Sequence, residues 1–389
     1  MAGVRMALDI FGVLFVLAAF LSVLYYWDPT RAYYKRFKAS DEFLYETIDP
    51  RFLAEDPDSF ITIRGQSDKI DTRAKLTRVI WGEAGIPLEA GPDEIVRDIH
   101  LAENLPSDCP AREFAYTHLR LECQVMKYAG WSNLSGIDEL RTTVGPDYTA
   151  SMAFFRPRVS NGVLVVYQHG YAGTYHAKHR YLEELIDKGY AVLAANHIGY
   201  GDNYCYEPTA KKVWCDVGWG KFGVPLPLRV HFSPLVKAIN YGLRQENMKR
   251  VAMIGFSAGG WLTSVLAAVD PRIVRSYPVA GFMPRFLQRD GERPPNQLYQ
   301  PLFDAAGMLD QFVLGASGAG RRQVQFFNKY DRCCYGGSRG LIYKSAVAAS
   351  VNKLGEGSFD VIIDETHARH KISRWTFDKI LSDLNQITD

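Results

Sequence analysis

The sequence predicts an α/β protein with a mostly parallel central sheet and helices on both faces of that sheet. Short, unbroken runs of Val, Ile, Leu and Ala recur from residue 162 onward, as in strands that are buried on both faces. Segments with helical spacing alternate with these runs, which favours parallel strands joined by crossover helices. A chain of 389 residues suits one enlarged domain with attachments.

The expected elements follow one another from residue 148 to the C-terminus. Strands are expected at 148–157, 163–167, 190–195, 250–254, 274–279, 324–328 and 359–363. Helices are expected at 179–188, 234–244, 261–269 and 374–384. Two longer stretches, 201–230 and 284–320, interrupt the alternation and are expected to be insertions or a lid. The catalytic or binding domain is therefore expected to span 151–389.

Residues 28–150 are expected to form an N-terminal extension that packs on this core. The stretch contains irregular, proline-containing segments, but Thr72 to Trp81 has the apolar spacing of a helix. Residues 114–125 hold alternating and aromatic side chains, which suit a pair of strands.

An uncharged apolar run, IFGVLFVLAAFLSVLYYW, occupies residues 10–27. As a helix, its 18 residues would span about 27 Å, close to the hydrocarbon thickness of a bilayer. Tyr25, Tyr26 and Trp27 end the run where an aromatic belt would lie. A cleaved signal peptide is the alternative, but Tyr-Tyr-Trp-Asp-Pro is a poor cleavage site. The sequence thus predicts a single-pass membrane anchor over residues 1–27.

Two observations disagree on the side of the membrane that the main domain occupies. Basic residues are denser after the apolar run than before it, which favours a cytoplasmic domain. The cysteine count is even, and Cys109 with Cys123, and Cys205 with Cys215, are spaced to close local loops in an oxidising compartment. We give the cysteines the greater weight and expect an extracytoplasmic domain.

The composition narrows the class of partner. Basic and acidic residues number 45 and 43, for a net charge of +2, so nothing indicates a nucleic acid as partner. No zinc-type Cys/His spacing and no phosphate-binding glycine loop is present, so neither a metal nor an organic cofactor is expected. The sequence is silent on the oligomeric state.

The sequence Gly255-Phe256-Ser257-Ala258-Gly259 fits the pattern G-x-S-x-G. A hydrophobic strand is expected before it and a helix of small residues after it. In that context the two glycines allow a tight turn that lifts the serine hydroxyl into the open. Ser257 is therefore the candidate nucleophile, and the following helix N-terminus favours developing negative charge there.

Together with this motif, several segments resemble the α/β-hydrolase superfamily of serine esterases and lipases over residues 162–385. They are QHGYAG at 168–173, NHIGYGDN at 196–203, Asp331 after a strand, and DETHARHKIS at 364–373. The resemblance implies an α/β-hydrolase fold with lid insertions. It also implies an oxyanion hole formed by the N–H groups of Ala258 and Tyr171, with Ala172 as the near alternative. His169 is expected to pack beneath the loop as a structural residue.

The chain order of the superfamily is Ser, then an acid, then His. Asp331, at the end of an expected strand, is the candidate acid, and Asp364 is less suitable because it lies beside the candidate histidines in sequence. The base is His370 or, as the alternative, His367, since both follow the last strand. The sequence pattern favours His370 and leaves both open.

These residues point to acyl transfer from a small-molecule or lipid-like carboxylic ester to water, through an acyl-enzyme on Ser257. An acyltransferase or a peptidase would use the same triad. A catalytically silent, membrane-anchored binding protein is the alternative from another class, because a fold alone does not establish activity.

Overall fold

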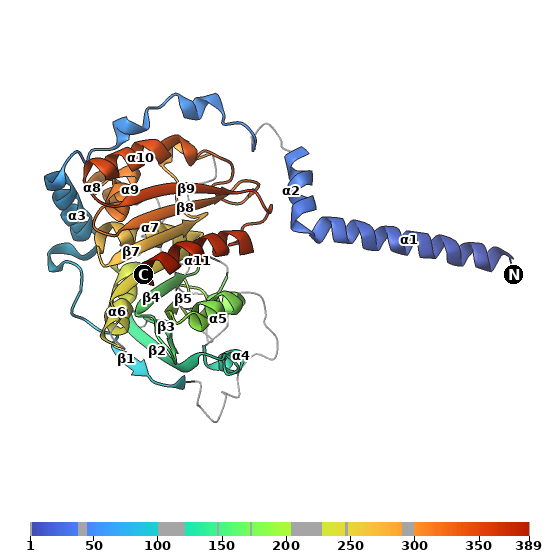
Figure 1. The fold of residues 1–389 in the computed structure, drawn as a ribbon, viewed down its shortest axis with the longest axis horizontal. Coiled ribbons are helices and arrows are strands. Elements are labelled where there is room, and N and C mark those ends of the chain that lie inside the picture. Colours follow the sequence, from blue (N-terminus) through green and yellow to red (C-terminus); the bar gives the residue numbers. More distant parts are fainter. Residues whose placement is uncertain are drawn as a thin grey trace.

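The structure is a computed structural model that describes residues 2–37, 45–99, 121–145, 148–171, 173–203, 228–245, 248–289 and 299–388. Within these residues a single nine-stranded sheet forms the centre of the molecule (Figure 1), in the order β1-β2-β3-β5-β4-β6-β7-β8-β9. The strands are β1 Glu94–Val96, β2 Leu134–Gly145, β3 Tyr148–Pro157, β4 Val163–Gln168, β5 Ala191–Ala195, β6 Arg250–Phe256, β7 Ile273–Val279, β8 Arg322–Asn328 and β9 Ser358–Asp364.

The strands from β5 to β9 are parallel, which confirms the predicted fold class. Every residue of β4 and β5 is buried, as expected for strands that are covered on both faces. Because parallel strands end at the same edge, the loops after β4, β6, β8 and β9 come together there. This edge carries the candidate site.

The first three strands pair in antiparallel fashion and extend the same sheet. The expected boundary between residues 150 and 151 falls inside β3. The last part of the N-terminal extension therefore contributes directly to the central sheet, in addition to packing on it.

Helices cover both faces of the sheet (Figure 1), and each face has its own apolar cluster. One face carries α3 Gln66–Trp81, α6 Leu228–Arg244, α7 Ala258–Val269, α8 Gln300–Ala305, α9 Met308–Ala316 and α10 Leu341–Lys353. The other face carries α4 Val125–Tyr128, α5 His179–Asp187 and α11 Arg374–Thr388. The predicted helix over residues 72–81 is confirmed as part of α3.

Two sequence predictions are wrong in the described residues. A pair of strands was expected over residues 114–125, but residues 121–123 form a 3₁₀ turn and α4 begins at Val125; residues 114–120 lie outside the described residues. Tyr128 packs edge-on against Trp131 and Phe155, so burial of one aromatic ring, and not strand pairing, decides this segment. Within the supposed insertion 284–320, α9 is buried along its whole length, and Phe312 packs on Phe282, so α9 is a core crossover helix.

The other supposed insertion, 201–230, lies mostly outside the described residues. Its last part belongs to α6, which begins at Leu228, ahead of the expected start at Pro234. Of the paired cysteines that were expected, Cys123 is disulfide-bonded, whereas Cys109, Cys205 and Cys215 lie outside the described residues.

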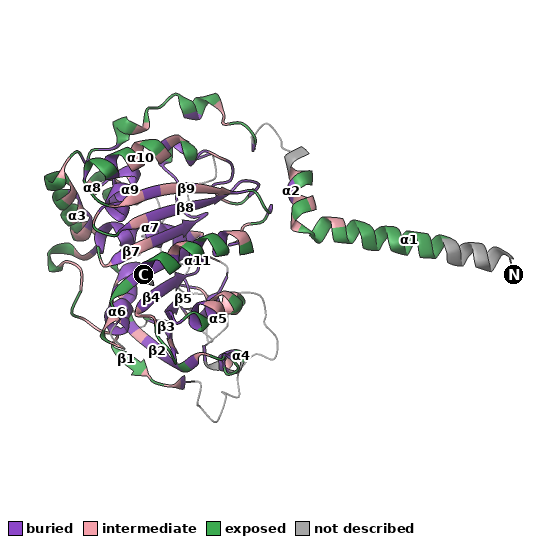
Figure 2. Ribbon diagram, viewed as in Figure 1, coloured by how far each residue is buried: buried purple, intermediate pink, exposed green. Residues whose placement is uncertain are grey.

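The N-terminus forms two helices, α1 Ala2–Tyr26 and α2 Asp28–Phe37, and α1 projects from the body (Figure 1). Figure 2 shows that α1 is exposed along most of the part where its side chains are described, with Leu24 half-buried; Phe11 and Phe15 are 75% and 76% exposed. Among the described helices, none is by itself long and apolar enough to cross a membrane. Residues 10–26 and 28–35 meet that standard only as a pair, bent by 78°.

Candidate active site

Ser257 occupies the sharp turn between β6 and α7. Its backbone has φ 55° and ψ −126°, a conformation that is costly for a residue with a side chain. The Ser257 N–H donates to the carbonyl of Val279 at 2.9 Å, and its own carbonyl accepts from Gly260 at 2.7 Å. The turn is thus held from both sides, and the surrounding structure imposes the strain on the serine.

The strand and the helix meet so closely at this turn that glycine is required. A Cβ atom on Gly255 would lie 2.1 Å from the carbonyl oxygen of Gly259 and 2.1 Å from Thr263 Oγ1. Both glycines of the G-x-S-x-G pattern therefore lie at the close contact between strand and helix, where the sequence analysis expected them to allow a tight turn.

The loop after β4 lies against the nucleophile turn. A Cβ atom on Gly170 would lie 2.6 Å from Ser257 Cβ and 2.9 Å from the backbone nitrogen of Ala258. Tyr171 follows Gly170 directly, so the loop that holds one candidate oxyanion donor touches the residue that holds the other. Ala172, the alternative donor, lies outside the described residues.

Asp331 and His370 are brought together from two loops that lie 39 residues apart near the C-terminus. Asp331 follows β8 and is buried; His370 lies in the loop after β9. Asp331 Oδ2 lies 2.6 Å from His370 Nδ1, while Oδ1 accepts the N–H of Cys333 at 2.8 Å. A carboxylate at Nδ1 fixes the tautomer that leaves Nε2 available as a base.

His370 also lies beside the serine turn. Its ring centroid is 4.7 Å from that of Phe256, the residue before Ser257. His370 Nε2 is buried and has no hydrogen-bond partner in the described part of the chain, Ser257 included. In unliganded sites the hydrogen bond between a catalytic serine and its histidine is often long or poorly aligned and tightens only around the substrate.

His367, the alternative base, belongs to a separate network. Its Nε2 lies 3.3 Å from Asp364 Oδ2, and both residues are fully buried. Asp364 also accepts from the hydroxyls of Thr366 at 2.6 Å and Thr376 at 2.7 Å. Burial alone would raise the pKa of Asp364, but hydrogen bonds from His367, Ser373 and Thr366 outweigh it and hold that pKa well below its usual range.

His169 packs beneath the loop after β4, the candidate oxyanion loop, as the sequence analysis expected. A Cβ atom on Gly173 would lie 2.3 Å from its ring, and Phe256 packs edge-on against it with ring centroids 5.5 Å apart. Burial lowers the pKa of His169 to about 3, so the ring is neutral at physiological pH.

The junction between α1 and α2 contacts the loop that carries His370. Asp28 pairs with Arg369 at 3.2 Å and with Lys371, the residues on either side of His370. Ala32 of α2 is buried with Ala368 of the same loop and with Tyr330, which precedes Asp331. The sequence analysis missed these contacts because residues so far apart in the chain share no local pattern.

Cys333 and Cys334 are joined by a disulfide next to Asp331. Their sulfur atoms and a ring nitrogen of His370 lie within 4.8 Å of one another, the separation of a possible metal site, but the disulfide holds both sulfurs. The sequence analysis missed this bond because it sought cysteines that close loops. Two adjacent cysteines, separated from the candidate acid by Arg332 alone, were the available signal.

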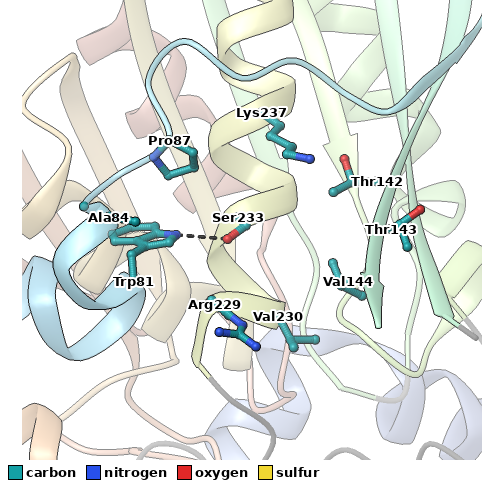
Figure 3. Close-up of a pocket in the computed structure, with 11 residues that line it drawn as sticks. Trp81, Ala84, Pro87, Thr142, Thr143, Val144, Arg229, Val230, Ser233 and Lys237 are labelled. Carbon is teal, nitrogen blue, oxygen red and sulfur yellow. Dashed lines mark hydrogen bonds between the residues drawn. The ribbon is translucent and has the colours of Figure 1, made fainter. Parts of the chain in front are cut away.

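A separate cavity of about 350 Å³ lies between α3, β2 and α6. Its lining includes Trp81, Thr142 and Lys237, and Trp81 Nε1 donates to Ser233 Oγ at 2.9 Å (Figure 3). None of Ser257, Asp331 and His370 lines it.

A family model described as "alpha/beta hydrolase fold" matches residues 163–315, which include the serine turn. The chain has the α/β-hydrolase fold. Among solved structures, an acetyl xylan esterase from Paenibacillus sp. R4 superposes with a TM-score of 0.50 at 15% identity, over 85% of this chain and 98% of that one. At that identity the likeness establishes the fold alone.

Two further solved structures superpose with lower TM-scores. Acetyl xylan esterase 1 from Thermoanaerobacterium sp. JW/SL YS485 has 13% identity and a TM-score of 0.48, over 86% of this chain and 98% of that one. An acylaminoacyl peptidase from Pyrococcus horikoshii has 15% identity and a TM-score of 0.45, over 67% and 43%. No curated protein sequence matches the chain.

Proposed function

We propose that the protein is a serine hydrolase that cleaves carboxylic esters through an acyl-enzyme on Ser257. The observation that carries the proposal is the backbone of Ser257, held at φ 55° between β6 and α7. A structural serine has no need of that strain, whereas a nucleophile exposed at the end of a parallel sheet does. The Asp331–His370 contact supplies an oriented base at the same edge of the sheet.

In the proposed mechanism His370 Nε2 takes the proton of the Ser257 hydroxyl as its oxygen attacks the ester carbonyl. The N–H groups of Ala258 and Tyr171 stabilise the oxyanion, an effect worth about 3–4 kcal/mol for each donor. The protonated imidazole, held by Asp331, gives its proton to the leaving alcohol. Water then attacks the acyl-enzyme with His370 again as the base. Ester is preferred to amide because an alkoxide leaves more readily than an amine anion.

The test is covalent labelling of the full chain with a fluorophosphonate, followed by peptide mass spectrometry. An adduct on Ser257 is expected, and Ser257→Ala should abolish it. Ser264→Ala, which removes a serine hydroxyl about two turns further along, in α7, should keep the adduct. A folded chain without any adduct on Ser257 would favour the silent binding protein. Product analysis with added alcohols separates hydrolysis from acyl transfer.

We also propose that α1 anchors the enzyme in a membrane. The support is its row of exposed apolar side chains, including Phe11, Phe15 and Phe20, which no described part of the chain covers. Leu17→Arg should release the protein from membranes in carbonate extraction, since a central arginine costs about 2.5–3.5 kcal/mol. Leu53→Arg, at an exposed leucine in the body, should leave fractionation unchanged. Equal extraction of all three chains would refute the anchor.

A further inference from the structure

A series of aromatic and imidazole rings runs from half-buried Tyr171 in the loop after β4 to buried Trp261 in the helix that follows the serine. The ring centroids of Tyr171 and His197 are 4.5 Å apart, those of His197 and His231 are 5.2 Å apart, and those of His231 and Trp261 are 6.1 Å apart. Trp261 lies one helical turn after Ser257, and its backbone N–H reaches the Ser257 carbonyl at 3.4 Å. The rings therefore link the loop after β4 to the helix α7, which begins directly after the proposed nucleophile.

Three ring nitrogens in this series of rings lack a hydrogen-bond partner in the described residues. They are His197 Nε2, His231 Nδ1 and Trp261 Nε1, and all three atoms are buried. A buried polar group without a partner costs about 1–3 kcal/mol, so three neighbouring ones indicate a position that a polar group occupies when the site is filled.

The hydrogen-bonding roles of these atoms define the group. His197 Nδ1 lies 2.9 Å from the carbonyl of Ile198 and must donate to it, which leaves Nε2 as an acceptor. Trp261 Nε1 can only donate. A group that satisfies both must donate to one ring and accept from the other, as a hydroxyl does.

The surroundings favour a neutral group over a carboxylate. Burial lowers the pKa of His197 to about 4 and that of His231 to about 3, so both rings are uncharged at neutral pH. An anion here would lose its hydration without gaining a positive partner from these rings.

We propose that His197, His231 and Trp261 form a subsite that recognises a neutral hydroxyl close to the scissile ester. The subsite rests on the proposed ester hydrolysis and adds the substrate class: esters that carry a hydroxyl either on the acyl chain or on the alcohol. Such a site rejects an analogue in which a methyl replaces the hydroxyl, because its own nitrogens then stay unpaired.

The experiment compares kcat/KM for two pairs of esters in which a methyl replaces a hydroxyl. Methyl lactate against methyl isobutyrate tests the acyl side, and 2-hydroxyethyl acetate against propyl acetate tests the alcohol side. The wild-type chain is expected to prefer the hydroxyl member of one pair by about tenfold or more. The pair that shows the preference identifies the side on which the hydroxyl lies.

Trp261→Phe, which removes the indole N–H together with the five-membered part of the ring, should lower this preference by about fivefold or more. The matched control is Trp81→Phe, which removes an indole N–H at the separate cavity of Figure 3 and should leave the preference unchanged. A wild-type ratio near one in both pairs overturns the subsite, and this holds even if Trp261→Phe does not fold. An unchanged preference in folded Trp261→Phe overturns it too.

Fluorophosphonate labelling of Ser257 in the same samples separates the two proposals. Labelling without any hydroxyl preference refutes the subsite alone. The absence of labelling refutes the ester hydrolase, and the subsite falls with it.

Discussion

Asp331 Oδ2 lies 2.6 Å from His370 Nδ1, and this contact joins the loop after β8 to the loop after β9. A second acid–histidine pair, Asp364 and His367, lies in the same loop region at 3.3 Å but is fully buried. The two pairs look alike in composition. They differ in that His370 lies against Phe256, beside the proposed nucleophile.

Replacing the two acids should therefore affect different properties, turnover for Asp331 and stability for Asp364. Asp331→Asn should lower kcat by about 10²–10⁴-fold, because an amide at Nδ1 favours the wrong imidazole tautomer. Asp364→Asn should chiefly lower stability, since Asp364 accepts hydroxyl hydrogen bonds from Thr366 and Thr376. Steady-state kinetics and urea unfolding of both variants measure the contrast. Comparable turnover in the two variants would contradict the assignment of Asp331.

Replacing the two histidines tests the base in the same way. His370→Ala should lower kcat by about 10³-fold or more in protein that is still folded. His367→Ala should cost about 1–3 kcal/mol in the free energy of unfolding, because it removes a partner from a buried carboxylate. If His367→Ala abolished turnover in folded protein while His370→Ala did not, His367 would be the base.

A methyl group on Gly170 should damage turnover more than folding. In Gly170→Ala the added Cβ would lie 2.6 Å from Ser257 Cβ, so the oxyanion loop must move away from the serine. Loss of one well-placed donor lowers kcat by about 10²–10³-fold. Gly65→Ala is the matched control, because a Cβ there meets nothing within 4 Å. Equal kcat values for the two variants would contradict the proposed role of the loop that contains Gly170 in stabilising the oxyanion.

Stability should fall as the pH is lowered from 7 to 5. Burial holds the pKa of His169 and His231 at about 3 and that of His197 at about 4. In the unfolded chain histidine has a pKa of about 6.5, so below that pH the unfolded state binds protons that the folded state does not.

Each such histidine can remove up to about 1.4 kcal/mol per pH unit below 6.5. Urea unfolding between pH 7 and 5 measures the slope, and His169→Gln should make it shallower by one proton. A slope that is the same in this variant and in the wild type would mean that His169 protonates in the folded state.

The Cys333–Cys334 bond should survive in purified protein kept without reductant. Alkylation of the native chain should leave both residues unmodified, and the peptide that contains them should lack two hydrogens until it is reduced. Ready alkylation of either residue without reductant would contradict the bond, and with it part of the case for an oxidising compartment.

Features set by neighbouring residues were accessible from the sequence. The serine turn is one, because strand, G-x-S-x-G pattern and helix lie within twenty residues and each constrains the next. The strand that presents Asp331 is another. By contrast, His367 and His370 follow the same strand, and their spacing in the sequence does not show which ring packs against Phe256. That choice depends on how the loop packs against the end of β6, which is distant in the sequence.

Features that depend on contacts between distant segments were not accessible. His231 and Trp261 stand on helices with apolar neighbours and are indistinguishable from core residues until the fold leaves their nitrogens unpaired. Likewise α9 interrupts the strand rhythm in sequence, and only its burial beside α7 identifies it as a core helix.

The ion pairs of Asp28 with Arg369 and Lys371 have a practical consequence for anyone who shortens the chain. Removing the apolar helix is the obvious route to easily handled protein, and a cut a few residues too far would take Asp28 with it. Partly exposed pairs of this kind contribute only about 0–1 kcal/mol each, so such a chain would still fold and would pass a stability assay. Its turnover, however, is expected to fall, because the loop that carries His370 would lose the ion pairs of Arg369 and Lys371 on either side of that histidine.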